Sequence, residues 1–151
     1  MQEKVYVDTS SLIILSKINA MYLLKKIYGK IYITSFIESE FNEPIPPWII
    51  VVPQNKTELY FLKEFNLGLG ESSIIMNALN NKAFLIIDDL KARKTATILK
   101  LNFTGSIGIL IIAKELGLIN SINFYLEQIQ KSNFRISDVV INKALEIANE
   151  K

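Results

Sequence analysis

Two short apolar runs in the chain each end directly in aspartate. Residues 5–7 precede Asp8, and residues 83–87 precede Asp88 and Asp89. Both runs have the length and the β-branched or aromatic content of buried strands, and a helical apolar pattern follows each of them. Ligand sites of parallel sheets form at the carboxyl ends of the strands. We therefore expect these acids to meet in one small volume, where like charges raise one another's pKa or require a cation.

Short apolar runs separated by helical patterns continue along the chain. The other predicted strands are residues 31–33, 48–52 and 101–103. Residues 57–66 are predicted as a short amphipathic helix, residues 68–70 as a turn, and the C-terminal third as helical. This alternation predicts an α/β fold with a doubly wound parallel sheet and right-handed crossovers. Neither a repeat nor a linker interrupts it, so a single domain spanning residues 1–151 is expected.

Composition narrows the chemistry, because the chain contains no histidine and no cysteine. This excludes disulfides, zinc sites of the usual Cys/His type, thiol nucleophiles and Ser-His-Asp triads. If the protein is an enzyme, carboxylates, hydroxyls, lysines and a bound metal are left to carry its reaction. A net charge of +2 does not by itself indicate a nucleic-acid partner.

No segment of the sequence has the pattern of a membrane span. The longest apolar stretch, residues 107–113, is far shorter than the ~20 residues that a spanning helix needs. The N-terminus does not have the layout of a signal peptide. We therefore expect no membrane association and a cytoplasmic location.

Two glutamates join the aspartates as candidate site residues. Glu71 lies in line with the apolar face of its predicted helix, which is unusual because burying an unpaired carboxylate is costly. Glu40 stands beside the buried stripe of the helix that follows residues 31–33. Glu38 falls on nearly the opposite side of that helix and matches a capping box with Ser35. We therefore favour Glu40 for the site.

Each acid also has a purely structural explanation. Asp8 and one of Asp88 and Asp89 are suited to capping helices, which stabilises a helix by ~1 kcal/mol. Glu71 in a first helical turn is favoured by the helix dipole. A cap needs only one of the paired aspartates, so its neighbour is free to face a shared site. Taken together, the acids favour a cation site, and their hard oxygens suit Mg²⁺ or Mn²⁺.

Five segments give the chain a specific resemblance. In order they are VYVDTSSLIILSKI, YITSFIESEF, LGLGESSIIMNAL, FLIIDDLKARKTA and NFTGSIGILIIAKELGLI, and the tail carries FRISDVVINKAL. Together they resemble PIN-domain proteins, in particular a poorly characterised bacterial and archaeal branch described as predicted nucleic-acid-binding. The GxGE, DDxxAR and TGSxG motifs in this order are far more specific than any one of them alone. The resemblance implies a three-layer fold, with a central, mainly parallel sheet flanked by helices.

The resemblance also implies an activity, because PIN domains are metal-dependent ribonucleases and many are the toxins of toxin–antitoxin pairs. The catalytic acids that it implies are Asp8, Glu40, Glu71 and Asp89. The implied ligands of Mg²⁺ or Mn²⁺ are Asp8, Glu71, Asp88 and Asp89. Asp89 aligns best with the acid that follows the fourth strand in the family, and Asp88 is a close second. Many PIN nucleases carry a further acid after the last strand, where this chain has Thr104-Gly105-Ser106.

Hydroxyl side chains surround the implied ligands. Thr9, Ser10, Thr104 and Ser106 are candidates to donate hydrogen bonds to the carboxylates that would hold the metal. Helix capping is the alternative role for Thr9 and Ser10.

Candidate contacts to single-stranded RNA come from basic and aromatic residues. Lys91, Arg93 and Lys94 follow the aspartate pair and would hold the RNA backbone, although a solvated helix face is the alternative. Tyr28 or Tyr32 would stack bases if exposed, or belong to the core. The implied partners are RNA, a small antitoxin protein and a second copy of the chain in a homodimer.

Two other functions compete with a ribonuclease that is the toxin of a pair. A PIN-like module that binds RNA or a protein without cutting is suggested by the missing acid at residues 104–106. A phosphoacceptor domain of receiver type would also use paired acids such as Asp88 and Asp89. That fold needs a lysine at a later strand end, and the strand at residues 101–103 is followed by Thr104 instead.

Overall fold

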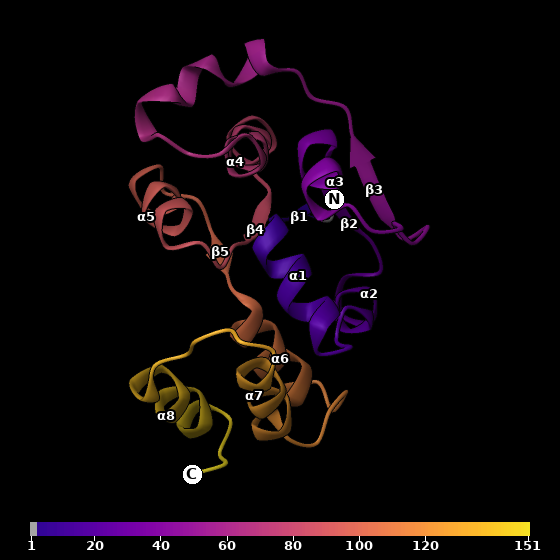
Figure 1. The fold of residues 1–151 in the computed structure, drawn as a ribbon, viewed down its shortest axis with the longest axis vertical. Coiled ribbons are helices and arrows are strands. Elements are labelled where there is room, and N and C mark those ends of the chain that lie inside the picture. Colours follow the sequence, from indigo (N-terminus) through magenta and orange to yellow (C-terminus); the bar gives the residue numbers. More distant parts are fainter. Residues whose placement is uncertain (1–2) are drawn as a thin grey trace.

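The protein is built around a parallel sheet, as seen in a computed structural model that describes residues 3–151. Five strands, all parallel to their neighbours, lie in the order β3-β2-β1-β4-β5. They are β1 (Val5–Val7), β2 (Ile31–Thr34), β3 (Ile49–Val52), β4 (Phe84–Ile86) and β5 (Phe103–Thr104). Helices flank the sheet (Figure 1), so the predicted three-layer α/β fold is confirmed.

Helices connect all of the strands and form the C-terminal third. They are α1 (Thr9–Lys17), α2 (Tyr22–Tyr28), α3 (Ser35–Phe41), η1 (Lys56–Phe65), α4 (Leu69–Asn81), α5 (Leu90–Ile98), α6 (Ser106–Glu115), α7 (Ile122–Lys131) and α8 (Asp138–Ile147). In the part of the chain that the structure describes, none of them combines the length and apolar character needed to cross a membrane.

The strand order creates a switch point between β1 and β4. The chain moves outward from β1 through β2 to β3, and then returns to the other side of β1 for β4 and β5. In doubly wound sheets, ligands bind in the crevice at the carboxyl ends of the strands where the order reverses. This order also rules out the receiver fold, whose strands follow the order 2-1-3-4-5.

Three local features differ in detail from the sequence predictions. The short amphipathic helix expected at residues 57–66 is present as η1, but it is a 3₁₀ helix. Its apolar residues Leu59, Leu62 and Phe65 recur every three residues, which matches the period of a 3₁₀ helix rather than 3.6. The predicted turn at residues 68–70 is already the start of α4, with Gly68 as its N-cap.

The third difference concerns the start of α3. The sequence left Thr34 or Ser35 as its first residue and matched Ser35 and Glu38 to a capping box, but the N-cap is Thr34, whose Oγ1 accepts a hydrogen bond from the backbone N–H of Ile37. Thr34 is buried, and its hydroxyl also pairs with that of Ser73 on α4 at 2.5 Å. The last residue of β2 therefore both ends the strand and joins two helices.

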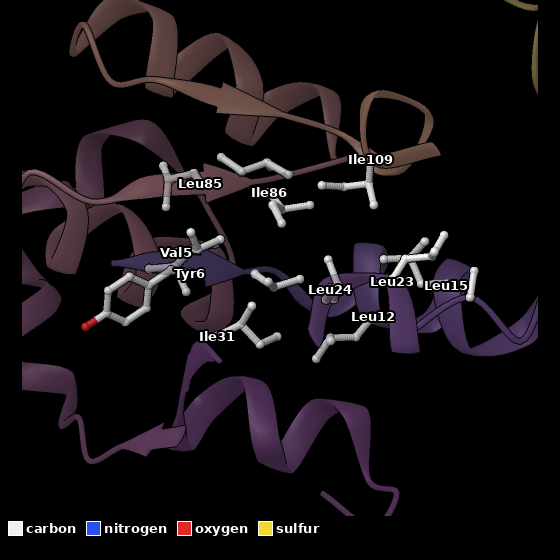
Figure 2. Close-up of a cluster of buried hydrophobic side chains, with 14 of the residues drawn as sticks. Val5, Tyr6, Leu12, Leu15, Leu23, Leu24, Ile31, Leu85, Ile86 and Ile109 are labelled. Carbon is white, nitrogen blue, oxygen red and sulfur yellow. The ribbon is translucent and has the colours of Figure 1, made fainter. Parts of the chain in front are cut away.

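The apolar core lies between the sheet and the helices that cover it. Figure 2 shows the side chains of Val5, Leu85 and Ile86 from the strands in one buried cluster with Leu12 and Leu24 of the first two helices and Ile109 of α6. All three residues of β1 are buried, as expected for a strand with neighbours on both sides. This packing fixes the positions at which β1 and β4 end, and so positions the acids that follow them.

The C-terminus is held to α7 by a single carboxylate. Glu150 accepts hydrogen bonds from Ser121 and from the backbone N–H groups of Ile122 and Asn123, and it pairs with Lys114 at 2.8 Å. Burial alone raises the pKa of Glu150, but the Lys114 ammonium and these donors outweigh burial and lower it to about 2. The carboxylate thus caps the first turn of α7 from a distant part of the chain.

We expect Glu150→Gln to lower the free energy of unfolding by about 1–2 kcal/mol at pH 7, because it removes the charge from this set of hydrogen bonds. The folded pKa lies below the ordinary value, so the stabilisation is present above about pH 4.5 and is lost as the pH falls towards about 2. Chemical denaturation at several pH values measures this effect. Glu146→Gln, on an exposed side chain, is the control, and equal stability of the two variants at pH 7 would contradict the assignment.

Candidate active site

Five acids lie at or beside the carboxyl ends of β1, β2 and β4, and together we call them the acidic edge. They are Asp8, Glu40, Glu71, Asp88 and Asp89. Asp8 follows β1, the two other aspartates follow β4, and the glutamates come from α3 and from the first turn of α4. They therefore gather at the switch point of the sheet.

Asp8 is the buried centre of the acidic edge. It is the N-cap of α1, and its side chain accepts hydrogen bonds from the backbone N–H of Ser11 at 2.7 Å and of Asp88 at 3.2 Å. Only 1% of the residue is exposed. Burial raises the pKa of Asp8 to about 6; hydrogen bonds from Ser11 oppose the rise and the charge of Asp88 adds to it. Capping alone therefore does not offset the desolvation of this carboxylate.

Asp88 is held by hydroxyl and backbone donors from two other elements. Ser11 Oγ on α1 donates to Asp88 Oδ2 at 2.6 Å. Ser106, the first residue of α6, donates its backbone N–H to Oδ1 at 3.0 Å and its hydroxyl to Oδ2. A Cβ at Gly105 would lie 2.7 Å from Asp88 Oδ1, so this glycine allows the turn after β5 to approach. Asp88 thus joins three elements.

Asp89 has a different role from its neighbour. It is the N-cap of α5, and its Oδ2 accepts a hydrogen bond from the backbone N–H of Ala92 at 2.9 Å. The side chain is half-buried, and its charge contributes to raising the pKa of Glu71. The two aspartates therefore have different contacts. Asp88 is directed towards Ser11 and Ser106, and Asp89 is close enough to Glu71 for its charge to act on that carboxylate.

Glu71 and Glu40 form the other side of the acidic edge. Burial raises the pKa of Glu71, and the charges of Asp89 and Glu40 raise it further, although the backbone N–H of Glu71 itself lowers it. Glu40 is exposed and accepts a hydrogen bond from Thr9 Oγ1 at 2.5 Å, which links α3 to the residue after Asp8. The negative charges of α3, α4 and α5 therefore act on one another in this region.

Gly70 allows Glu40 to reach this position. A Cβ at Gly70 would collide with Glu40 Oε1 and would lie 2.9 Å from Ile37 Cδ1. Gly70 is buried in the first turn of α4, directly before Glu71. The absence of a side chain here lets α3 and α4 pack closely enough to bring the two glutamates together.

We expect Gly70→Ala to displace Glu40 and to lower the free energy of unfolding by about 1–3 kcal/mol, because the added methyl group overpacks the contact with the buried Ile37. Thermal unfolding measures the loss of stability, and a crystal structure of the variant shows the position of Glu40. Gly117→Ala has open space around it but a φ of +75°, so it tests the effect of backbone strain without a clash. A Gly70→Ala protein as stable as wild type, with Glu40 in its original position, would contradict this role of Gly70.

The predicted hydroxyl residues do not all contact the acids. Thr9 binds Glu40 and Ser106 binds Asp88, as described above. Ser10 is exposed, and its side chain forms no hydrogen bond with any residue between 3 and 151. Thr104 forms none within the same range, and it packs against Gly108. Ser11, which was not among these predicted residues, is the serine that contacts two acids.

Of the predicted RNA-binding residues, only Arg93 is directed towards the acidic edge. Its guanidinium lies over the ring of Phe103, 5.2 Å from the centroid, and near Gly105. Lys91 and Lys94 on the same helix are exposed and line no cavity beside the acids in the described part of the chain.

The two candidate tyrosines lie elsewhere. Tyr28 and Tyr32 line a cavity of about 370 Å³ together with Lys4, Lys30 and Phe84, which stand at the amino ends of the strands. This is the opposite edge of the sheet from the acids. A base stacked on either tyrosine would therefore not lie in the crevice at the acidic edge.

The donor set of the acidic edge fits a divalent cation that keeps part of its water shell. Among residues 3–151, no three acidic side chains form a group that could hold an ion by themselves. Mg²⁺ is commonly bound by one or two carboxylates, with waters and substrate phosphates completing its shell. Burial of Asp8 and the raised pKa of Glu71 show carboxylates whose charge is not fully compensated. A cation would compensate it.

Comparison with known families covers nearly the whole chain. A model of the DUF3368 family, described as a PIN domain, matches residues 4–150. No curated protein matches the chain. The matched residues run from β1 to beyond α8 and include all five acids of the acidic edge.

Proposed function

Because the chain belongs to the PIN-domain family, we propose that it is an endoribonuclease that depends on Mg²⁺ or Mn²⁺ and cleaves single-stranded RNA. PIN domains are generally nucleases, and the crevice between β1 and β4 is where a sheet of this order binds its ligand. The single observation that carries the proposal is the buried carboxylate of Asp8 at this crevice, with its pKa raised to about 6. Perturbed acids in clefts are typical of functional sites.

Asp8, together with Asp89 or Glu71, would hold the ion, and water and substrate phosphates would complete its shell. Asp8 is fixed in place by the N–H groups of Ser11 and Asp88, and Asp89 is fixed by its cap on α5. When bound, a divalent cation polarises a phosphoryl oxygen and makes a nucleophile available at neutral pH. This accounts for an active site without histidine.

The other residues of the acidic edge would position the ligands. Thr9 holds Glu40 on the side of Glu71, and Ser11 and Ser106 hold the carboxylate of Asp88.

The test is cleavage of an unstructured, end-labelled RNA by the purified protein with Mn²⁺ or Mg²⁺. We expect cleavage that EDTA stops and that added Mn²⁺ restores. A DNA strand of the same sequence serves as the comparison for substrate class. Cleavage that persists in EDTA, or no cleavage of any of several RNAs with either metal, would contradict the proposal.

The finer form of the proposal makes this protein the toxin of a toxin–antitoxin pair, inhibited by a small partner and acting as a homodimer. Growth arrest on expression, relieved by the product of a neighbouring gene, tests the toxin role. Growth arrest that Asp8→Asn does not relieve would argue against it.

A binding module without cleavage is the second candidate, and one observation favours it. Where many PIN nucleases have a further acid, Ser106 donates hydrogen bonds to Asp88, so the charge of Asp88 is balanced by protein donors rather than shared with a metal. RNA affinity that is independent of metal, with no turnover, supports this candidate over the nuclease.

A further inference from the structure

Two neighbouring cavities adjoin the acidic edge on the side of α8. One, of about 260 Å³, lies between Arg93 and Lys143, and the other, of about 280 Å³, is bordered by Arg135. Asp88, Ile107 and Val140 line both. The two cavities are therefore adjacent at Asp88, and we call them together the α8 groove.

Cationic side chains from three separate elements line this groove. Arg93 comes from α5, Arg135 from the segment before α8, and Lys143 from α8 itself. The chain has only two arginines, and both are here. Within residues 3–151, none of the three cations forms an ion pair, even though Asp88 lines the same groove. Their charges are thus available to an anionic ligand.

Arg93 is positioned for such a ligand by the turn after β5. Its guanidinium lies over the ring of Phe103, an arrangement that holds the plane of the guanidinium while leaving its N–H donors free. A Cβ at Gly105 would lie 3.0 Å from Arg93 Nη1 and 2.7 Å from Asp88 Oδ1. The Arg93 guanidinium and the Asp88 carboxylate therefore both lie next to Gly105. An anion bound by Arg93 would lie close to the acids.

We propose that the α8 groove binds the phosphate backbone of single-stranded RNA and leads it to the acidic edge, with α8 as one wall. Phosphates recur along the strand, and the three cations line a groove whose two cavities are adjacent at Asp88. The walls between the cations are apolar, including Ile107 and Val140, and suit ribose and base surfaces. Each cavity is smaller than the roughly 300–1,000 Å³ of typical small-molecule sites. An RNA strand that lies along both cavities therefore fits the α8 groove better than a small ligand bound in one of them.

This inference rests on the proposed function for its substrate, but its test does not require cleavage. The experiment measures the affinity of the full chain for a fluorescent single-stranded RNA by anisotropy, in EDTA and at several salt concentrations. The variants are Lys143→Ala and Arg135→Ala. The control is Lys26→Ala, which removes the same charge as Lys143→Ala from an exposed position on α2 that lines neither cavity.

We expect each groove variant to bind about tenfold more weakly than wild type, since each loses a charged hydrogen-bond donor to a phosphate. The slope of log affinity against log salt should become shallower by about 0.7 for each cation removed. Lys26→Ala should match wild type. Arg93→Lys keeps the charge but loses the planar fork, so it should bind more weakly without the full change in slope.

The possible outcomes distinguish the groove proposal from the proposed nuclease activity. Equal affinities of Lys143→Ala, Arg135→Ala and Lys26→Ala, or no RNA binding by wild type, would overturn the groove proposal even if the protein cleaves RNA. Weakened binding by the groove variants together with no metal-dependent cleavage would support the groove and overturn the proposed nuclease.

Discussion

Replacing Asp8 with asparagine is expected to reduce metal-dependent RNA cleavage more than about 100-fold. Mutation of residues that only support metal ligands typically lowers activity or metal affinity 10- to 100-fold, so loss of a ligand should have a larger effect. Asparagine keeps an oxygen that can accept the hydrogen bond from Ser11, so the start of α1 is preserved. Its amide nitrogen cannot accept the longer hydrogen bond from the backbone N–H of Asp88, so the change removes a charge and one hydrogen bond from the acidic edge.

The same variant should be more stable than wild type in EDTA at pH 8. The pKa of Asp8 is higher in the folded protein, at about 6, than the ordinary value of 3.8. Since this carboxyl binds its proton more tightly when folded, wild-type stability falls as the pH rises through this window. Asparagine resembles the neutral form, so we expect a gain of up to about 3 kcal/mol above pH 6 that disappears below about pH 4.

Cleavage assays and denaturation curves of the Asp8→Asn protein at pH 4 and pH 8 measure both effects. Asp138→Asn is the matched control, because it makes the same chemical change at an exposed position outside the acidic edge. Cleavage by Asp8→Asn at the rate of the control would contradict a catalytic role for Asp8. An Asp8→Asn protein that is less stable than wild type at pH 8 would show that contacts in the folded protein compensate for burial of the Asp8 charge.

The second large effect is expected at Asp88, and it is an effect on stability. Asp88→Ala leaves both donors of Ser106 without their acceptor, and the Ser11 hydroxyl keeps only its longer contact of 3.4 Å with the carbonyl of Ile86. An unsatisfied buried donor costs about 1–3 kcal/mol, and water at this half-buried position can replace part of the loss. We therefore expect the free energy of unfolding to fall by about 2–4 kcal/mol.

At Asp89 we expect the opposite: a small effect on stability and a clear effect on cleavage. Asparagine is as good an N-cap as aspartate, so Asp89→Asn should change stability by less than about 0.5 kcal/mol. It removes a charge near Glu71, however, and cleavage should fall at least about 10-fold. Denaturation and cleavage measured on both variants distinguish the two aspartates. A stable Asp88→Ala protein that does not cleave, beside an active Asp89→Asn protein, would reverse the assignment.

Strand periodicity and the residues that end each strand were sufficient to predict much of this fold. Apolar runs followed by aspartate identified β1 and β4, and the alternation with helical patterns predicted the parallel sheet. These features are local, so they can be read from short windows. The strand order is not local, because it depends on which helices pack against which face. The position of the switch point therefore emerged only from the three-dimensional structure.

The placement of the acids near the carboxyl ends of the strands could be predicted from the sequence, but their contacts could not. Both glutamates could be selected by their spacing from apolar residues on one helix. Ser11, by contrast, lies three residues after Asp8, where a first-turn side chain can turn back towards the cap, and its contact with Asp88 crosses 77 residues of sequence. The close approach at Gly70 is likewise a tertiary contact between two helices. The GxGE motif marks Gly70 in the sequence, but it does not show that another helix packs against this glycine.

The central claim is that the acidic edge holds a divalent cation, and the most direct measurement is anomalous X-ray diffraction from crystals of the protein soaked with Mn²⁺. The account predicts a peak at the switch point of the sheet, within coordination distance of Asp8 and of Asp89 or Glu71. Soaked crystals of Asp8→Asn should lack it. A peak only at another place, or an unchanged peak in the Asp8→Asn crystals, would contradict the account.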